Sequence, residues 1–331
     1  MSSKPIIIVC GEPQSVFFEI FLKTIKKLNI KRFKNPLLLI TSNSILYENF
    51  KKFKINFKKN YIDEKLINLK KDELNIINIP YNNFSFKKKI TIQSNNFIKK
   101  CFNTALKLLK NNKCLGLVNG PISKKTFLKG KFYGITEYLA ANTKSKDPVM
   151  LIFNKDLSVC PLTTHIPVSK VEKKIKKTKI IKKINNIHLF YKNYLKKKPK
   201  IAITGLNPHC ENFRTLNVER KEIIPAINYL KKKNIDIKGP FSADTIFLRD
   251  NIKKFDVVVG MYHDQVLGPM KAIYGFKAIN ITIGLPFLRV SPDHGPNEKM
   301  LGKNKSSPES LIEAINFYKK YAKFCQNIVK F

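Results

Sequence analysis

The sequence lacks both of the common glycine-rich signatures of nucleotide binding. It contains no G-x-G-x-x-G run and no G-x-x-x-x-G-K-[ST] run, the loops in which Rossmann folds and P-loop proteins hold phosphates on backbone N–H groups. No motif therefore predicts either fold, and any nucleotide must bind in another way.

Long apolar runs are also missing. No stretch approaches the roughly 18 apolar residues that a membrane-spanning helix needs. The apolar run before Gly11 is too short for the core of a secretory signal and has no small-residue cleavage site. We therefore expect a cytoplasmic protein with no membrane partner.

Arginine is scarce, although the formal net charge is +40. Of the 63 basic residues, the arginines are only Arg32, Arg214, Arg220, Arg249 and Arg289. Such a charge would ordinarily suggest a polyanion as partner, but nucleic-acid readers commonly use Arg for bidentate and stacking contacts. The lysines are spread along the chain beside abundant Ile and Asn, a pattern typical of AT-rich codons. We therefore expect no nucleic-acid partner.

Cysteine pairs of the C-x-x-C type are absent. The six cysteines form no regular framework; they are Cys10, Cys101, Cys114, Cys160, Cys210 and Cys325. Several stand inside apolar runs, so they are expected to be reduced and partly buried rather than to form disulfides.

The residues that are present indicate an α/β fold. With 331 residues, 43% of them hydrophobic, the chain can bury one large core or two smaller ones, and its length favours two lobes. Short β-branched runs alternate with segments of helical period. Examples are the strands 5–9, 37–40 and 115–118, the helices 15–28, 44–53 and 180–195, and the later strands 201–205, 257–259 and 278–283. This alternation predicts a largely parallel sheet.

Two further segments carry specific expectations. The residues 310–324 have Leu311, Ile315 and Tyr318 on one helical face and are expected to form a terminal helix that packs back on an earlier lobe. The Lys- and Asn-rich stretch Lys51–Lys71 has mixed periodicity and is expected to be irregular surface structure.

Histidine is sparse, yet three of the five histidines occur where strand ends or turns are expected. They are His165 in Thr-Thr-His-Ile-Pro, His209 in Gly-Leu-Asn-Pro-His and His263 in Met-Tyr-His-Asp-Gln. Strand-end loops are where α/β sheets build sites, and imidazoles suit zinc, cobalt or nickel and leave positions open for a substrate oxygen. The spacing matches no local metal motif, so a structural role for each histidine stays open from the residues alone.

Lys271, Asn280 and Arg289 recur at nine-residue intervals around the expected strand 278–283. Two cations and an amide could clamp a phosphate. The alternative is a solvated lysine and a surface ion pair, although Arg289 is conspicuous in an arginine-poor chain.

Other polar residues suggest ring binding and proton transfer. Asp293-His294-Gly295, with Asn304 further on, would form a loop against which a flat ring or a ribose can lie, although a plain turn would use the same glycines. Asp244 and Asp264 are the carboxylates best placed for proton transfer or for orienting a ligand imidazole. Either could instead cap a helix.

Taken together and in order, these sequence motifs resemble those of one enzyme family, the 4-hydroxythreonine-4-phosphate dehydrogenases of vitamin B6 synthesis. The resemblance runs from about Gly11 to the last helix. The matching motifs are Leu-Val-Asn-Gly-Pro-Ile, Thr-Thr-His165, Gly-Leu-Asn-Pro-His209, Ala-Asp-Thr, Met-Tyr-His263-Asp-Gln, Asn280-Ile-Thr-Ile-Gly-Leu-Pro-Phe-Leu-Arg289 and Asp-His-Gly.

The resemblance implies a two-domain fold like that of the isocitrate and isopropylmalate dehydrogenases, with mostly parallel sheets and a cleft between the domains. The first lobe would comprise residues 1–138 and 300–331, and the second lobe, 139–299, would carry the metal ligands and the dimer interface. NAD or NADP and a divalent metal (zinc, magnesium or cobalt) would be the cofactors of a homodimer with shared active sites.

The resemblance also implies roles for individual residues. The metal ligands fall on His165, His209 and His263, reaching the site from both subunits. The phosphate and substrate contacts fall on Thr136, Lys271, Asn280 and Arg289, and the adenosine loop on Asp293, His294, Gly295 and Asn304. The substrate's C3 hydroxyl would be oxidised, with Asp244 or Asp264 as base or orienting group, and carbon dioxide would leave to give 3-amino-2-oxopropyl phosphate.

The chain departs from the family pattern near these residues. Gln14-Ser15-Val16-Phe17-Phe18 replaces a glycine-rich run, Ile135 stands where a histidine is usual, Cys210–Arg214 lacks a Gly-Glu-Gly-Gly run, and Pro296-Asn297 replaces a small pair. Three interpretations follow: the B6 enzyme itself, a paralogue that oxidises threonate or erythronate phosphate, or an inactive basic binding protein.

Overall fold

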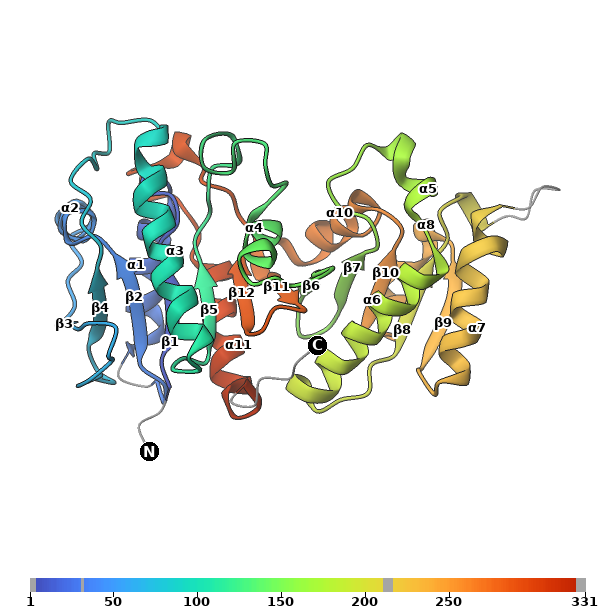
Figure 1. Cartoon of the computed structure of the whole chain (residues 1–331). Coiled ribbons are helices and arrows are strands. Elements are labelled where there is room, and N and C mark those ends of the chain that lie inside the picture. The colour runs from blue at the N-terminus through green and yellow to red at the C-terminus, as the bar shows by residue number, and fades with distance from the viewer. Residues whose placement is uncertain (1–3, 31–32, 211–216, 326–331) are drawn as a thin grey trace. The chain divides into compact units, whose positions relative to one another are not determined.

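A computed structural model describes residues 4–30, 33–210 and 217–325 of the chain. The chain divides into two compact units: the first runs to Lys146 and resumes at Leu285, and the second is Asp147–Gly284. The sequence analysis predicted slightly different boundaries, with residues 1–138 and 300–331 in the first lobe and residues 139–299 in the second. The three histidines of interest lie in the second unit, and Figure 1 labels the elements of both.

The first unit is built on a parallel sheet. Its strands, in sheet order, are β3 (Lys59–Tyr61), β4 (Leu74–Asn78), β2 (Leu37–Thr41), β1 (Ile6–Val9), β5 (Gly116–Asn119) and β12 (Leu288–Pro292). These six strands pair in parallel. The central strands are apolar and buried along their length, as expected for a parallel sheet covered on both faces.

Helices cover this sheet. They are α1 (Phe17–Leu28), α2 (Asn43–Phe53), α3 (Asn95–Lys110), α4 (Ile135–Asn142) and α11 (Glu309–Cys325), with a π-helical turn η3 at Lys124–Leu128. Helix α3 lies on β1 and β2, and α11 lies on β12 and β5. Figure 1 shows α3 crossing the strands of the blue and green part of the chain.

The terminal helix returns to the first unit, as its apolar face predicts. The buried Tyr318 hydroxyl lies 3.1 Å from the carbonyl oxygen of Leu117 and 2.7 Å from that of Leu288, so it bridges β5 and β12. Gly116 lies beneath it: a Cβ there would come within 2.5 Å of the Tyr318 hydroxyl and of Leu288 O. Glycine is therefore required for this close packing.

The second unit has a mixed sheet. Its strands, in sheet order, are β11 (Ile279–Ile283), β6 (Val149–Phe153), β7 (Ser158–Pro161), β10 (Val257–Gly260), β8 (Ile201–Thr204) and β9 (Ile237–Phe241). Pairs β11–β6 and β6–β7 are antiparallel, whereas β7–β10, β10–β8 and β8–β9 are parallel.

Helices flank the second sheet. They are α5 (Val171–Lys174), α6 (Lys177–Phe190) with its π-helical continuation η5 (Tyr191–Leu195), η7 (Glu219–Ile223), α7 (Ile224–Lys232), α8 (Ala243–Ile246), α9 (Arg249–Ile252) and α10 (His263–Tyr274). Helix α10 packs on β7 and β10, and Val266, Leu267 and Met270 join the sheet core there. The helix begins at the residue where a metal ligand is expected.

The alternation predicted from the sequence is confirmed, and one expectation is wrong. Within Lys51–Lys71, expected to be irregular, residues 59–61 form the edge strand β3 beside β4. Its side chains alternate between exposed and half-buried, so the segment carries no buried apolar run that would reveal a strand. Within the described ranges no helix is long and apolar enough to cross a membrane, and the expected cytoplasmic location stays a prediction.

Candidate active site

Three adjacent parallel strands of the second unit each end in a loop that carries one of the histidines. His165 follows β7, His263 follows β10, and His209 follows β8, and the sheet order is β7-β10-β8. Because parallel strands present their carboxyl ends at one edge of the sheet, the three loops share that edge. The sequence correctly predicted that the histidines stand at strand ends.

Two of these imidazoles lie close together. The ring centroids of His165 and His263 are 5.9 Å apart, with the ring planes tilted by 35°. Two imidazoles bound to one ion through bonds of about 2.1 Å have centroids roughly 5 to 6 Å apart. The pair therefore fits a shared divalent ion. His165 holds a left-handed backbone, with φ of 38°, a conformation that is uncommon outside glycine and often accompanies function.

Asp264 orients the imidazole of His263. Its Oδ1 lies 2.6 Å from Nδ1 of His263. A carboxylate that accepts a hydrogen bond from Nδ1–H fixes the tautomer and leaves Nε2 with a free lone pair, the usual arrangement behind a metal-binding histidine. His263 is the first residue of α10 and Asp264 is in its first turn, where negative charge is favourable.

Gln265 joins the ends of β8 and β10, a role that sequence reasoning missed. Its Oε1 accepts hydrogen bonds from the backbone N–H of Met261 at 2.7 Å and from the Thr204 hydroxyl at 2.9 Å. Its Nε2 donates to the carbonyl of Gly205 at 2.9 Å. The side chain therefore fixes the loop of His263 relative to the strand that leads to His209. The one feature of the sequence that points to Gln265 is its position in the motif His263-Asp264-Gln265.

Glu219 holds the loop that leads to His209 and was also missed. This carboxylate is fully buried. It accepts the backbone N–H groups of Leu206 and Asn207 at 2.9 and 2.8 Å and the side-chain amide of Asn207 at 2.9 Å. His209 itself is exposed and left-handed, with φ of 56°. Carboxylates are few in this chain, which is the signal that could have drawn attention to Glu219.

Asp244 lies in the first turn of α8, directly after β9, and is exposed. Burial raises the pKa of the Cys210 thiol, and the charges of Glu219 and Asp244 raise it further. Asp244 is therefore near the turn that carries His209. The departure from the family pattern at Cys210–Arg214 falls mostly on residues 211–216, which lie outside the described residues.

The described residues of one chain do not by themselves form a complete metal site. Across residues 4–30, 33–210 and 217–325, no three His, Cys, Asp or Glu side chains are grouped closely enough to hold one ion. The His165–His263 pair and the carboxylate behind it have the donor chemistry that borderline divalent metals prefer. They fit such an ion but do not complete its coordination.

The four residues expected to bind substrate are divided between the units. Lys271 is exposed on α10, and Asn280 lies on β11, where its Oδ1 is buried and has no hydrogen-bond partner in the described part of the chain. Thr136 and Arg289 lie in the first unit. Regular nine-residue spacing therefore does not by itself place Lys271, Asn280 and Arg289 on one element.

Arg289 and Thr136 are in contact. Arg289 lies on β12 with only 1% of its surface exposed. Its Nε donates to Oδ1 of Asn119 at 2.8 Å, and its NH1 donates to the Thr136 hydroxyl at 3.3 Å. Burial lowers the pKa of the guanidinium to about 10, while the nearby Tyr318 and Glu137 favour its charged form. The group therefore carries a positive charge at neutral pH. Ile135, in place of the usual histidine, is the first residue of α4 and is half-buried.

The loop after β12 contains the residues expected to bind adenosine. Nδ1 of His294 lies 3.0 Å from the carbonyl of Gly295, and Nε2 is buried without a partner among the described residues. Burial lowers the pKa of His294, so the ring is neutral at pH 7 and Nε2 can accept a hydrogen bond. A Cβ on Gly295 would meet nothing within 4 Å, which leaves space above this turn. Asp293 N–H is held by the Ser310 hydroxyl at 2.9 Å.

Glu12 follows β1, at the same end of the first sheet as the loop after β12, and is fully buried. Burial raises its pKa from 4.5 to about 7, although the Ser94 hydroxyl and the N–H of Gln14 act in the opposite direction. Gly11 before it has φ of 73°, and a Cβ there would come within 2.3 Å of Pro121 O. The sequence analysis assigned no role to Glu12.

Known proteins resemble the chain over most of its length. A 4-hydroxythreonine-4-phosphate dehydrogenase from a Sulfurihydrogenibium species is 44% identical over 215 residues, 64% of this chain and 66% of that protein. A protein from Oceanobacillus iheyensis, provisionally named D-threonate 4-phosphate dehydrogenase, is 32% identical over 96% of this chain and 97% of its own. The crystal structure of 4-hydroxythreonine-4-phosphate dehydrogenase from Klebsiella pneumoniae is 26% identical, with a TM-score of 0.83, and covers 98% of this chain and 100% of that chain.

More distant structures establish the fold. An isocitrate dehydrogenase from Methylococcus capsulatus, 12% identical, has a TM-score of 0.51 and covers 98% of this chain and 88% of that chain. The expected fold class, like that of isocitrate dehydrogenase, is therefore confirmed. The family described as pyridoxal phosphate biosynthetic protein PdxA matches residues 32–318. The chain belongs to the PdxA family, whose named members are dehydrogenases.

Proposed function

We propose that this chain oxidises 4-hydroxythreonine 4-phosphate with NAD or NADP and releases carbon dioxide, forming 3-amino-2-oxopropyl phosphate for pyridoxal phosphate synthesis. In the first step the C3–H bond breaks, its hydride passes to the nicotinamide, and the hydroxyl proton passes to a base. In the second step the C–CO₂ bond breaks and the carbon receives a proton. The observation that carries the proposal is the His165–His263 pair, with Asp264 behind it, at the strand ends of a PdxA family member.

The substrate's phosphate would bind to the cations and amides expected from the sequence. Arg289 is buried, charged at neutral pH and hydrogen-bonded to Thr136. Because the two side chains already hold each other in place, binding an anion would cost them little conformational entropy. Asn280 has a buried Oδ1 with no partner among the described residues, which a substrate amine or hydroxyl could satisfy. Lys271 would supply a second positive charge.

The base would be a carboxylate near the histidines. Asp244 is exposed near the His209 turn, so it is available to accept the hydroxyl proton. Asp264 is already engaged with His263, and its role would be to orient the imidazole rather than to remove the proton.

His165, His209 and His263 would hold a divalent ion in a homodimer, with ligands from both subunits. When bound, the ion would act as a Lewis acid toward the reacting oxygen. The adenosine half of the dinucleotide would lie on the loop of Asp293, His294, Gly295 and Asn304, where a neutral His294 offers a hydrogen-bond acceptor.

The proposal is tested by following NADH formation from 4-hydroxythreonine 4-phosphate by the purified, metal-supplied protein. We expect activity that a chelator abolishes and that His165→Ala, His209→Ala and His263→Ala each lower by at least about a hundredfold. The matched control is His188→Ala, because His188 lies on α6 and is not among the proposed ligands. A chelator-resistant activity, or an equal loss in the control, would contradict the proposed site.

Two observations favour an alternative substrate, threonate 4-phosphate: the residue at position 135 and the name of one relative. Ile135 replaces the usual histidine, and the Oceanobacillus protein, related over nearly its whole length, carries a threonate phosphate name. Threonate 4-phosphate has a hydroxyl where 4-hydroxythreonine phosphate has an amine. The two are distinguished by kcat/KM measured side by side, and a preference for threonate 4-phosphate that Ile135→His reverses would favour the second substrate.

A further inference from the structure

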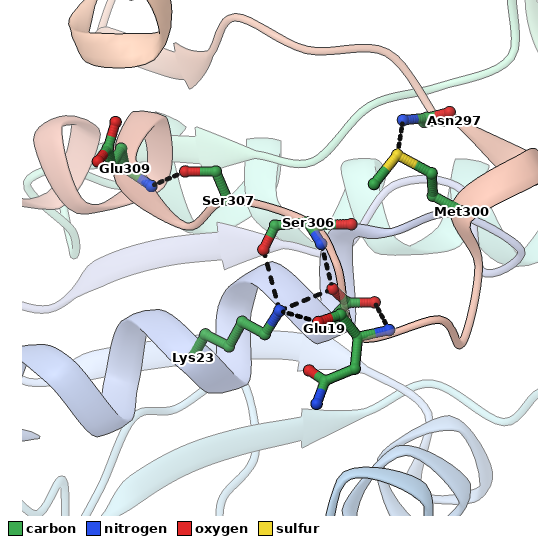
Figure 2. Close-up of polar contacts among 8 residues, drawn as sticks. Glu19, Lys23, Asn297, Met300, Ser306, Ser307 and Glu309 are labelled. Atoms are coloured by element: carbon green, nitrogen blue, oxygen red, sulfur yellow. Dashed lines mark hydrogen bonds and ion pairs between the residues drawn. The ribbon is translucent and has the colours of Figure 1, made fainter.

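Two charged residues of helix α1 hold the backbone of the loop that contains Asn304. Glu19 accepts the N–H of Asn304 on Oε2 at 3.1 Å and the N–H of Ser306 on Oε1 at 2.6 Å. Nζ of Lys23 donates to the carbonyl oxygens of the same two residues, each at 3.0 Å. Glu19 and Lys23 also pair with each other at 2.9 Å. Figure 2 shows the side chains of Glu19 and Lys23 meeting the backbone of the loop at Ser306.

This clamp, formed by Glu19 and Lys23, is largely shielded from water. The Glu19 side chain is 2% exposed and that of Lys23 is 23% exposed. A buried carboxylate is tolerated only when its oxygens are satisfied, and here each oxygen has a backbone N–H. Glu19 also lies in the first turn of α1, where the helix dipole favours a negative charge.

The same helix holds the other end of the loop. The N–H of Val16, the residue that precedes α1, donates to the carbonyl of Pro296 at 3.0 Å. The start of α1 therefore contacts the loop both just after Gly295 and again at Asn304 and Ser306. The segment that was expected to bind adenosine is fastened to α1 at both ends.

The clamp determines which group Asn304 presents outward. Asn304 has a left-handed backbone, with φ of 58°, and both of its backbone polar groups face Glu19 and Lys23. The residue is exposed, so its side-chain amide is accessible to a ligand. A carboxamide on a fixed backbone offers one acceptor and two donors, which suits an adenine edge or a ribose hydroxyl.

We infer that Glu19 and Lys23 are positioning residues that set the affinity for the adenosine half of the dinucleotide by fixing Asn304. This inference rests on the proposed function, because it takes the loop to be the cofactor loop. Releasing the clamp would lower the fraction of molecules whose loop is competent to bind, and the apparent dissociation constant would rise by the same factor.

ADP-ribose, which lacks nicotinamide, is the direct probe, and its binding is measured by calorimetry. We expect Glu19→Gln and Lys23→Met to weaken ADP-ribose binding roughly tenfold and to raise KM for NAD similarly. The kcat at saturating NAD and the KM for the phosphorylated substrate should remain within about twofold. Lys26→Met is the matched control, since Lys26 is exposed on the same helix, and it should change none of these values.

A double-mutant cycle separates positioning from general loss of structure. If Glu19 acts through Asn304, Glu19→Gln should add little to Asn304→Ala, because the group it positions is already gone. Fully additive effects, or unchanged ADP-ribose affinity in folded Glu19→Gln and Lys23→Met proteins, would overturn the inference while leaving the proposed function intact. Lys23→Met keeps the test available if Glu19→Gln does not fold. A wild-type protein that binds neither ADP-ribose nor NAD would overturn the proposed function as well.

Discussion

Nε of Arg289 donates a 2.8 Å hydrogen bond to Oδ1 of Asn119, which joins β12 to the end of β5 inside the first unit. Both residues are buried, at 1% and 2% exposure. A guanidinium proposed to bind phosphate is thus also part of the unit's interior, and its substitution should affect stability as well as activity.

Replacing Arg289 should lower the free energy of unfolding. Arg289→Met leaves the Asn119 acceptor buried and unpaired, and we expect a loss of about 2 kcal/mol or more, measured by urea unfolding. Arg249→Met is the control, because Arg249 is exposed on α9 and should cost less than about 0.5 kcal/mol. Equal stability of the two variants would show that the buried contact contributes little.

Gln265 should matter for both stability and activity. Gln265→Leu keeps the approximate shape of the side chain but removes the hydrogen bonds to Met261, Thr204 and Gly205. We expect a destabilisation of about 2 to 4 kcal/mol and a fall in kcat, since the His263 loop loses its attachment to β8. Gln93→Leu, at an exposed position of the first unit, serves as control. A Gln265→Leu protein with wild-type kcat would contradict the positioning role.

Asp264 should influence metal affinity more than the chemical step. Asp264→Asn weakens the hydrogen bond to Nδ1 of His263, and loss of such a partner typically lowers metal affinity 10- to 100-fold. Activity should therefore fall at limiting metal and recover at excess metal, as followed by metal titration of the apoprotein. Asp250→Asn, at a position 92% exposed, should titrate like the wild type. Failure of excess metal to restore activity would point to a direct part in proton transfer.

Glu12 should make stability depend on pH. Its pKa is raised from 4.5 to about 7 in the folded protein, so the folded state binds a proton more tightly than the unfolded state. The resulting stability is fully present below pH 4.5, decreases as pH rises from 4.5 to about 7, and is lost above that, a change on the order of 3 kcal/mol. Glu12→Gln should remove this decrease. The check is the difference between wild-type and variant unfolding free energies at pH 5 and pH 8, and a difference that does not change with pH would contradict the prediction.

The elements that the sequence predicted well are those with a local signal. Buried strands such as β1 and β2 are continuous apolar runs, and α11 has an apolar stripe. The strand-end positions of His165, His209 and His263 followed from their flanking turn residues. The edge strand β3, by contrast, has polar, half-exposed side chains and leaves no periodic signal.

The residues that position the site were harder to predict for a physical reason. Glu19, Glu219 and Gln265 act by binding backbone N–H or carbonyl groups of other segments. Backbone groups are present at every residue, so the partner of such a side chain has no sequence signature. The contact between Arg289 and Thr136, separated by 153 positions, was not predicted, because the family resemblance implied only that each of them contacts substrate.

The bridge from Tyr318 to Leu117 and Leu288 has a consequence for the order of synthesis on the ribosome. The second unit is continuous, Asp147–Gly284, whereas the first unit needs β12 and α11, which follow it in the chain. During translation the emerging β5 edge therefore has no β12 beside it until the whole second unit has been made. Residues 116–119, buried in the finished protein, remain an open strand edge for that interval, and an edge of this kind is prone to pair with other chains.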